Sequence, residues 1–165
     1  MRLTVVLGDL HERECGLARH LADIAQRHRA DHEVHHVARD LSNWCRGHAA
    51  TLAEVGRPHG LDRSALETEP RSAPSSATPE AHALSGRLAE RADDDTGLRL
   101  LYDLRQVCTD ATGVRLDWEM VGQAAQALRD PALLDAAQSC GKETQRIIQW
   151  ADGKLKEASP QVLST

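Results

Sequence analysis

The segment that most strongly constrains the fold spans residues 3–28 and reads LTVVLGDLHERECGLARHLADIAQRH. Most residues of its recurring stripe are apolar, and they repeat every three or four positions: Leu3, Leu7, Leu10, Glu14, Leu17, Leu21, Ile24 and His28. An α-helix has 3.6 residues per turn, so this period places the stripe on one helix face. The segment therefore predicts an amphipathic helix of about seven turns, with Glu14 in its buried stripe.

A second stripe of the same period runs from His32 to Val55, after the short polar link 29–31. Asp31 is suited to cap the start of this helix. The sequence Gly56-Arg-Pro58 predicts its end, because proline cannot continue a helix. Two long amphipathic helices joined by a short link predict an antiparallel hairpin with its turn near Ala30.

Residues 57–78 are rich in Ser, Pro and Ala and have no periodicity, which predicts a flexible connection. Such a segment is long enough to travel the length of a helical bundle, so the next helix can start at either end. The sequence Thr78-Pro79 is typical of a helix start. Within that third helix, residues 93–97 read DDDTG. Three acidic residues and a glycine are poor helix-interior residues, so this run predicts an interruption or a kink.

Gly113 is predicted to end the third helix, and Asp117 to begin a shorter one that reaches Leu128. Asp130-Pro131 predicts the start of the last helix, and Pro160 its end. The small side chains of the last helix predict a close approach to its neighbour, and they are Ala137, Cys140, Gly141 and Thr144. We therefore predict an all-α fold in one domain, 1–165. It is a four-helix bundle of two helical hairpins joined by a long crossover, plus one short extra helix.

Composition narrows the classes of function. The chain has 165 residues, a formal net charge of −5 and only 2% aromatic residues. Nucleic-acid binding is not expected, because a binder needs positive charge and aromatic stacking platforms. No segment has the apolar length of a signal peptide or a membrane span, so we expect a cytoplasmic protein that does not bind a membrane. The four cysteines are expected to be reduced there. The sequence allows a homodimer, and it indicates no other assembly.

The hairpin brings candidate metal ligands to one level. With the turn near Ala30, Glu14 lies opposite His48, and Cys15 lies opposite Cys45. His11 and Cys15 share a helix face, as do Cys45 and His48, because residues three or four apart are neighbours on a helix. Thiolate, imidazole and carboxylate together suit a divalent transition metal such as zinc, iron or manganese. The alternative is a metal-free polar layer in which Glu14 and His48 satisfy each other.

Two further clusters are weaker candidates. Histidines gather at the hairpin turn, where Glu33 also lies: His28, His32, His35 and His36. Their spacing suits capture of a divalent metal, but the turn interrupts it, and a solvated helix end that titrates near pH ~6.5 is the alternative. The triplet Asp93-Asp94-Asp95 lacks the glycine and glutamate of a calcium loop, so we interpret it as a solvated helix end.

The chain resembles the ferritin-like superfamily of four-helix bundles, and within it the small bacterial stress-associated members. The resemblance is carried by Glu14, by Glu33-Val-His35-His36, by the long crossover and by the motif Lys142-Glu143 in the last helix. It implies the bundle fold. The di-iron motif of the family is incomplete, however, because Cys45-x-x-His48 stands where the family has Glu-x-x-His. Glu143 is likewise followed by Arg146 where a histidine is expected.

Three functions follow as hypotheses. The first is a non-enzymatic ferritin-like bundle that acts as a binding or structural module. The second is a metal-binding protein that uses Glu14 and His48 with some of His11, Cys15 and Cys45. The third is a metal-dependent redox enzyme, which is least favoured because the sequence offers no second activating group. No residue is assigned a catalytic role.

Overall fold

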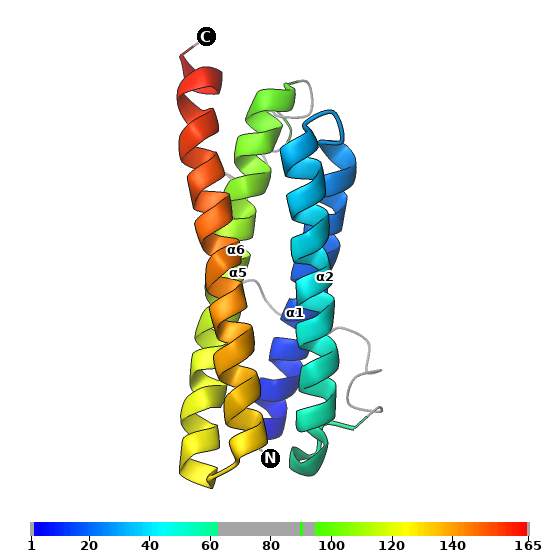
Figure 1. Cartoon of the computed structure of the whole chain (residues 1–165), viewed down its shortest axis with the longest axis vertical. Helices are drawn as coiled ribbons and strands as arrows, with labels where there is room; N and C mark the ends of the chain where they lie inside the picture. The colour runs from blue at the N-terminus through cyan, green and yellow to red at the C-terminus, as the bar shows by residue number, and fades with distance from the viewer. Residues whose placement is uncertain (1, 63–89, 91–94, 165) are drawn as a thin grey trace.

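The computed structural model describes residues 2–62, 90 and 95–164, and within these ranges the regular structure is helical throughout. The helices are α1 (Arg2–Arg27), α2 (His32–Val55), the short 3-10 helix η1 (Arg57–His59), α5 (Thr96–Leu128) and α6 (Pro131–Leu163). The predicted all-α four-helix bundle is thereby confirmed (Figure 1).

The four long helices form two antiparallel hairpins. In Figure 1, α1 runs upward from the N-terminus and α2 returns downward, while α5 runs downward and α6 rises to the C-terminus. Helix α1 packs on α2 and on α5, and α6 packs on α5 and on α2. Helix α2 ends at the bottom of the bundle and α5 begins at the top, so these two ends lie at opposite ends of the bundle (Figure 1).

Side-chain caps begin the helices where the sequence predicts them. The carboxylate of Asp31 accepts from the backbone N–H of Val34 at 3.1 Å, and α2 starts there. Asp130 accepts in the same way from Leu133 at 3.0 Å, at the start of α6. The interruption predicted in the acidic run is confirmed at Asp95, which is extended and caps α5. Each cap satisfies an N–H that has no partner inside its helix.

Helix α5 corrects one prediction. It passes through Gly113 without a break, and the shorter helix predicted from Asp117 is its second half. The buried stripe of α5 keeps its phase across the glycine, from Ala111 to Val114 and Trp118. Burial of this stripe outweighs the cost of about 1 kcal/mol for a glycine inside a helix. Asp117 forms an ion pair with Arg13 of α1, with 3.4 Å between Nε and Oδ2.

Two other boundaries differ from the prediction. Helix α6 includes Pro160 and continues to Leu163, because a proline in the last turn forfeits only one backbone hydrogen bond at an exposed end. The connection predicted as flexible from residue 57 begins with ordered structure instead. There η1 is followed by Leu61, which is buried against Gly56. The rest of that connection and the helix start predicted at Thr78 lie outside the described residues.

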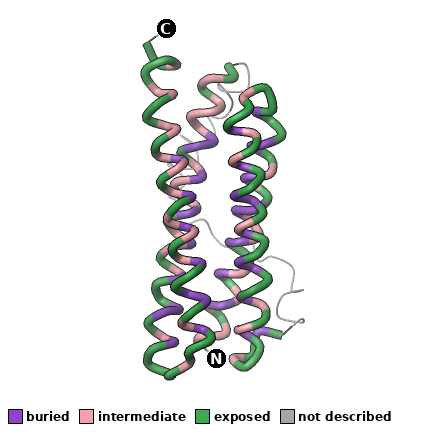
Figure 2. The backbone as a smooth tube through the Cα atoms, in the orientation of Figure 1, coloured by how far each residue is buried: buried purple, intermediate pink, exposed green. Residues whose placement is uncertain are grey.

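The core runs along the axis between the hairpins, as the buried positions in Figure 2 show. Its largest members include Leu10, Leu21, Leu104, Trp118 and Ile147. Helices α5 and α6 approach closely, as predicted, because a Cβ on Gly122 would lie 3.6 Å from the Cβ of Ala137. None of the described helices combines the length and the apolar character that a membrane crossing requires.

Candidate metal centre

The centre is built around Glu14, which α1 carries into the core with no solvent exposure. Its Oε1 accepts two hydrogen bonds, one from Nδ1 of His48 at 3.1 Å and one from Nε1 of Trp118 at 2.7 Å. Its Oε2 has no hydrogen-bond partner among the described residues, although it is buried. A buried carboxylate oxygen without a partner is costly, so a ligand at this atom would be favourable.

His48 of α2 lies between two carboxylates. Its Nδ1 donates to Glu14, and its Nε2 donates to Oε2 of Glu143 on α6 at 2.7 Å. Burial alone would lower the pKa of His48, but the hydrogen bonds and charges of the two glutamates outweigh it and raise that pKa. The two glutamates therefore shift the imidazole toward the protonated form, in which both ring nitrogens donate.

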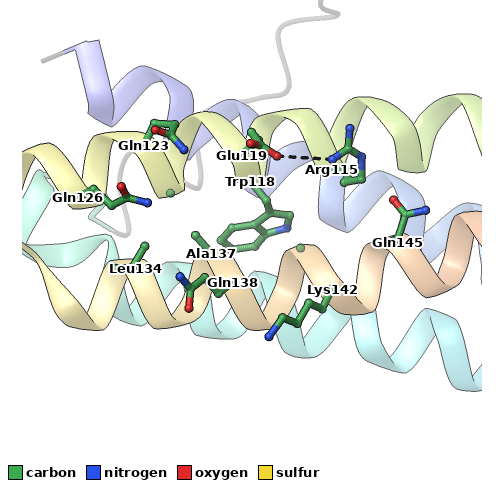
Figure 3. A pocket seen from close by; sticks show the side chains of 12 residues that line it. Arg115, Trp118, Glu119, Gln123, Gln126, Leu134, Ala137, Gln138, Lys142 and Gln145 are labelled. Carbon is green, nitrogen blue, oxygen red and sulfur yellow. Dashed lines mark ion pairs between the residues drawn. The ribbon is translucent and has the colours of Figure 1, made fainter.

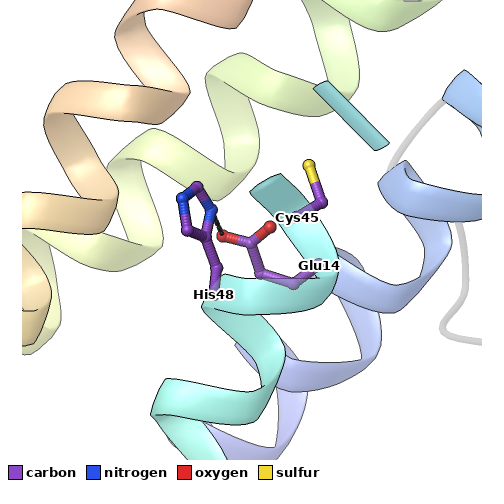
Figure 4. Close-up of side chains that lie close together, drawn as sticks. All are labelled: Glu14, Cys45 and His48. Carbon is purple, nitrogen blue, oxygen red and sulfur yellow. Dashed lines mark hydrogen bonds and ion pairs between the residues drawn. The ribbon is translucent and has the colours of Figure 1, made fainter. Parts of the chain in front are cut away.

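The third member is Cys45, one turn before His48 on α2. Figure 4 shows the Glu14 carboxylate between the His48 ring and the Cys45 sulfur. One ligand atom from each of the three residues lies within 4.8 Å of the other two, and all three residues are buried. Burial, and then the negative charge of Glu14, raise the pKa of the Cys45 thiol. In this state the thiol is neutral and a poor nucleophile.

A groove between α2 and α6 lies beside this centre, and His48 is the member of the cluster that lines it. Its volume is about 500 Å³, and its wall includes His48, Glu143 and Cys140. The Glu143 side chain is 42% exposed, whereas the His48 side chain is 4% exposed. Burial, followed by the charges of Glu14 and Glu143, raises the pKa of Cys140 to about 12. Glu143 therefore lies between the buried ring of His48 and solvent.

A second groove, of about 360 Å³, lies between α5 and α6 (Figure 3). Its rim is polar and includes the ion pair between Arg115 and Glu119, whose nitrogen and oxygen atoms are 3.5 Å apart. The indole of Trp118 forms part of its lining and is 1% exposed. Because the same indole donates to Glu14, it stands between this groove and the centre.

The predicted ligands separate into two groups. The structure brings together Glu14, Cys45 and His48, as the hairpin geometry predicts. His11 and Cys15 contact each other, with 3.9 Å between Nδ1 and Sγ, but they do not belong to the cluster of three. Successive residues on a helix are 100° apart, so Cys15 points away from the direction of Glu14. Whether any of the five binds a metal stays a prediction.

The cluster predicted at the turn is also divided. His28 is buried and donates to Asp103 of α5 at 2.8 Å, so it belongs to the packing between α1 and α5. Glu33 accepts from Lys154 of α6 at 2.7 Å and is not available to His36 as a fellow ligand. Asp95 of the acidic triplet is a helix cap, and the other two members lie outside the described residues.

Sequence reasoning missed two members of the centre. From the sequence, Glu143 enters only through the family resemblance and its incomplete motif, and Trp118 is not among the predicted ligands. A signal for both was present, because Cys140-x-x-Glu143 repeats the spacing of Cys45-x-x-His48. Trp118 and Glu143 also stand at nearly equal distances from the turn at Asp130, and so at one level of the second hairpin.

No protein-family model matches the chain, and neither curated protein sequences nor solved structures give a match.

Proposed function

We propose that this protein is a metal-binding helical bundle that holds one divalent transition-metal ion at Glu14, Cys45 and His48. The observation that carries the proposal is the juxtaposition of three buried ligand types around a carboxylate oxygen that has no partner in the described part of the chain. Carboxylate, thiolate and imidazole are together the donor set of zinc, and iron accepts the same set. Manganese is the least favoured of the three metals, because it prefers oxygen ligands.

The arrangement fits an ion after a small contraction. Tetrahedral zinc with bonds of about 2.0–2.3 Å places its donor atoms roughly 3.3–3.8 Å apart. The three donors lie within 4.8 Å of one another, so rotation of side chains closes the difference. Binding displaces the thiol proton of Cys45 and the Nδ1 proton of His48, because only the thiolate and the neutral imidazole are ligands.

Glu143 supports the same function as an orienting group. Histidines that bind metals almost always donate their second N–H to a carboxylate or a carbonyl, which fixes the ring and raises its basicity. His48 has this arrangement, because its Nε2 already donates to Glu143 while its Nδ1 faces Glu14. Glu143 is therefore a positioning residue, and it lines the groove that lies beside His48.

The course of the helices supports the resemblance to ferritin-like bundles, since two hairpins joined by a lengthwise crossover are typical of them. A centre for two metals is not proposed. At the level of Glu14, the corresponding place on α5 is occupied by Trp118, and its indole cannot ligate an ion. The proposal is accordingly a single-ion site.

Metal content after purification without a histidine tag tests the proposal. We expect about one zinc or iron ion per chain, lost in Cys45→Ser and in His48→Ala. Cys108→Ser is the matched control, because Cys108 is a thiol on α5 outside the cluster, and this variant is expected to retain the metal. Metal-free protein whose melting temperature does not respond to added zinc, iron or manganese would contradict the proposal.

The second candidate is the binding or structural module, and we propose that it acts as a homodimer through the outer face of α5. One observation favours it. Leu116, Met120 and Leu128 are about half exposed, at 49%, 53% and 56%, and they are spaced by multiples of four residues. Light scattering tests it: a dimer that becomes monomeric in Leu116→Lys/Met120→Lys is expected, and a monomeric wild-type protein rejects it.

A further inference from the structure

Three histidines stand in the first two turns of α2, at the end of the bundle remote from the N-terminus. His32 and His36 are exposed, and their ring centroids are 6.0 Å apart. His35 is half-buried, and its ring meets that of His36 edge-on at 5.0 Å. The rings of His32, His35 and His36 therefore form one surface patch on α2, and none of these residues belongs to the centre at Glu14.

The spacing of His32 and His36 suits chelation. Residues four apart on a helix are stacked on the same face, so both rings can turn toward one point. With zinc–nitrogen bonds of about 2.0–2.1 Å, the centroid of each ring lies roughly 3.2 Å from the ion, so two rings at adjacent positions of one ion have centroids about 4.5–5.2 Å apart. The observed separation is 6.0 Å, so the two exposed rings must turn toward each other to bind one ion.

Contacts with neighbouring groups hold the histidine rings of this patch in place. The carbonyl oxygen of Ala25 can only accept, so the 2.7 Å contact requires Nδ1 of His35 to carry the proton. This hydrogen bond fixes the ring of His35. The ring of His36 packs edge-on against that fixed ring, which restricts its motion. The Oε2 of Glu33 is paired with Lys154, and the donors that face one another at the patch are imidazoles. Imidazole nitrogen is a good ligand for copper(II), nickel(II) and zinc(II).

We propose that His32 and His36 chelate one divalent transition-metal ion at the surface of the bundle, in a site separate from the centre at Glu14. The ion belongs to the class that prefers nitrogen donors, namely copper(II), nickel(II) or zinc(II). The remaining coordination positions face solvent and are filled by water. His35 acts on the site through the ring of His36, as a positioning residue.

Copper(II) added to the untagged full-length protein provides the test. We expect a bound ion whose paramagnetic resonance spectrum shows nitrogen ligation, and we expect His32→Ala/His36→Ala to lose that ion. His20→Ala is the matched control, since His20 has no histidine four residues away, and it should retain the ion. Circular dichroism checks that each variant keeps its helices. An unchanged spectrum in the double variant overturns the proposal.

A rescue variant tests the spacing itself. His32→Ala alone should lose the ion, and His32→Ala/Asp40→His should regain it, because His36 then has a histidine four residues further along the same face. Asp40 is exposed, so the replacement disturbs no packing. Failure of the rescue in a folded protein contradicts chelation by helical spacing.

The outcome is independent of the proposed function. His48→Ala removes the centre at Glu14 and leaves the exposed pair intact, so it should keep the copper that His32→Ala/His36→Ala loses. Copper that binds only through the exposed pair supports this inference and leaves the proposed function to its own test with zinc and iron. Zinc or iron that depends on His48, in a protein whose exposed pair binds no copper, supports the proposed function and rejects this inference.

Discussion

At His48, one imidazole is held between the carboxylates of Glu14 and Glu143. Its pKa is raised in the folded protein, so the fold binds this proton more tightly than the unfolded chain does. In the metal-free protein, the resulting stabilisation is complete below the ordinary histidine pKa of about 6.5 and disappears as the pH rises through the folded value. The residue therefore favours protons at low pH and a metal ion at higher pH, because both compete for Nδ1.

Glu143→Gln should lower the pKa of His48. The amide keeps the size of the carboxylate and can still accept from Nε2, but it removes the negative charge that stabilises the imidazolium. The pKa is measured from the ring resonances of His48 in a pH titration by NMR. Glu119→Gln is the control, because Glu119 is exposed and pairs with Arg115. A His48 pKa equal to that of the wild type would show that Glu143 does not act on the ring.

Trp118→Phe should destabilise the fold by about 1–3 kcal/mol, because it removes the N–H that donates to the buried Glu14. Denaturation by urea measures the change. Trp150→Phe is a matched control. Its Nε1 is buried but has no hydrogen-bond partner in the described part of the chain, so this variant removes an aromatic N–H and no bond. Equal losses in the two variants would mean that the indole contributes only by packing.

Between elements, Asp103 joins the end of α1 to α5. The side chain is 1% exposed, and its Oδ2 accepts from Arg27 at 2.7 Å and from His28 at 2.8 Å. Burial alone would raise the pKa of this carboxyl group, but these hydrogen bonds outweigh it and hold the pKa below its ordinary value. The stabilisation is therefore present above about pH 4 and is lost as the pH falls through the folded pKa.

Asp103→Asn should lower the free energy of unfolding at neutral pH by about 1–3 kcal/mol, because charged hydrogen bonds are replaced by weaker ones. It should also flatten the fall in stability between about pH 4 and pH 2. Urea denaturation at several pH values measures both effects. Asp40→Asn, at an exposed position, should leave the curve unchanged. If the variant loses stability at low pH as the wild type does, another carboxylate is responsible for that loss.

The boundaries of the elements were predictable where a local signal decides them. Asp31 and Asp130 cap α2 and α6 as predicted, because a side-chain acceptor next to free N–H groups acts within one turn. Gly113 and Pro160 misled the prediction, because their local preferences are worth little against packing. The stripe on both sides of Gly113 is buried by tertiary contacts, and Pro160 lies where the helix ends within a turn anyway.

At the scale of the molecule, polar contacts link the two hairpins along the described length of the bundle. They include His59 with Asp130 at one end, the group around Glu14 in the middle, and Asp103 with its partners at the other end. The sequence predicted Glu14, Cys45 and His48 together, because a short turn fixes levels within one hairpin. It places Trp118 and Glu143 at one level of the second hairpin, but it does not align that level with Glu14, because the spacing of residues within one hairpin says nothing of how the other hairpin is shifted or oriented.

Zinc should raise the melting temperature of the whole bundle if the centre exists, because a ligand that binds only the folded state stabilises it by mass action. A zinc concentration a hundredfold above the dissociation constant contributes about 2.7 kcal/mol, which raises the melting temperature of a chain of this size by about 5–10 °C. The measurement uses His32→Ala/His36→Ala as background, so that the exposed pair does not contribute. Within that background, Cys45→Ser should abolish the shift and Cys108→Ser should preserve it. A background protein that zinc does not stabilise would leave Glu14, Cys45 and His48 as a polar layer that only fixes the alignment of the helices.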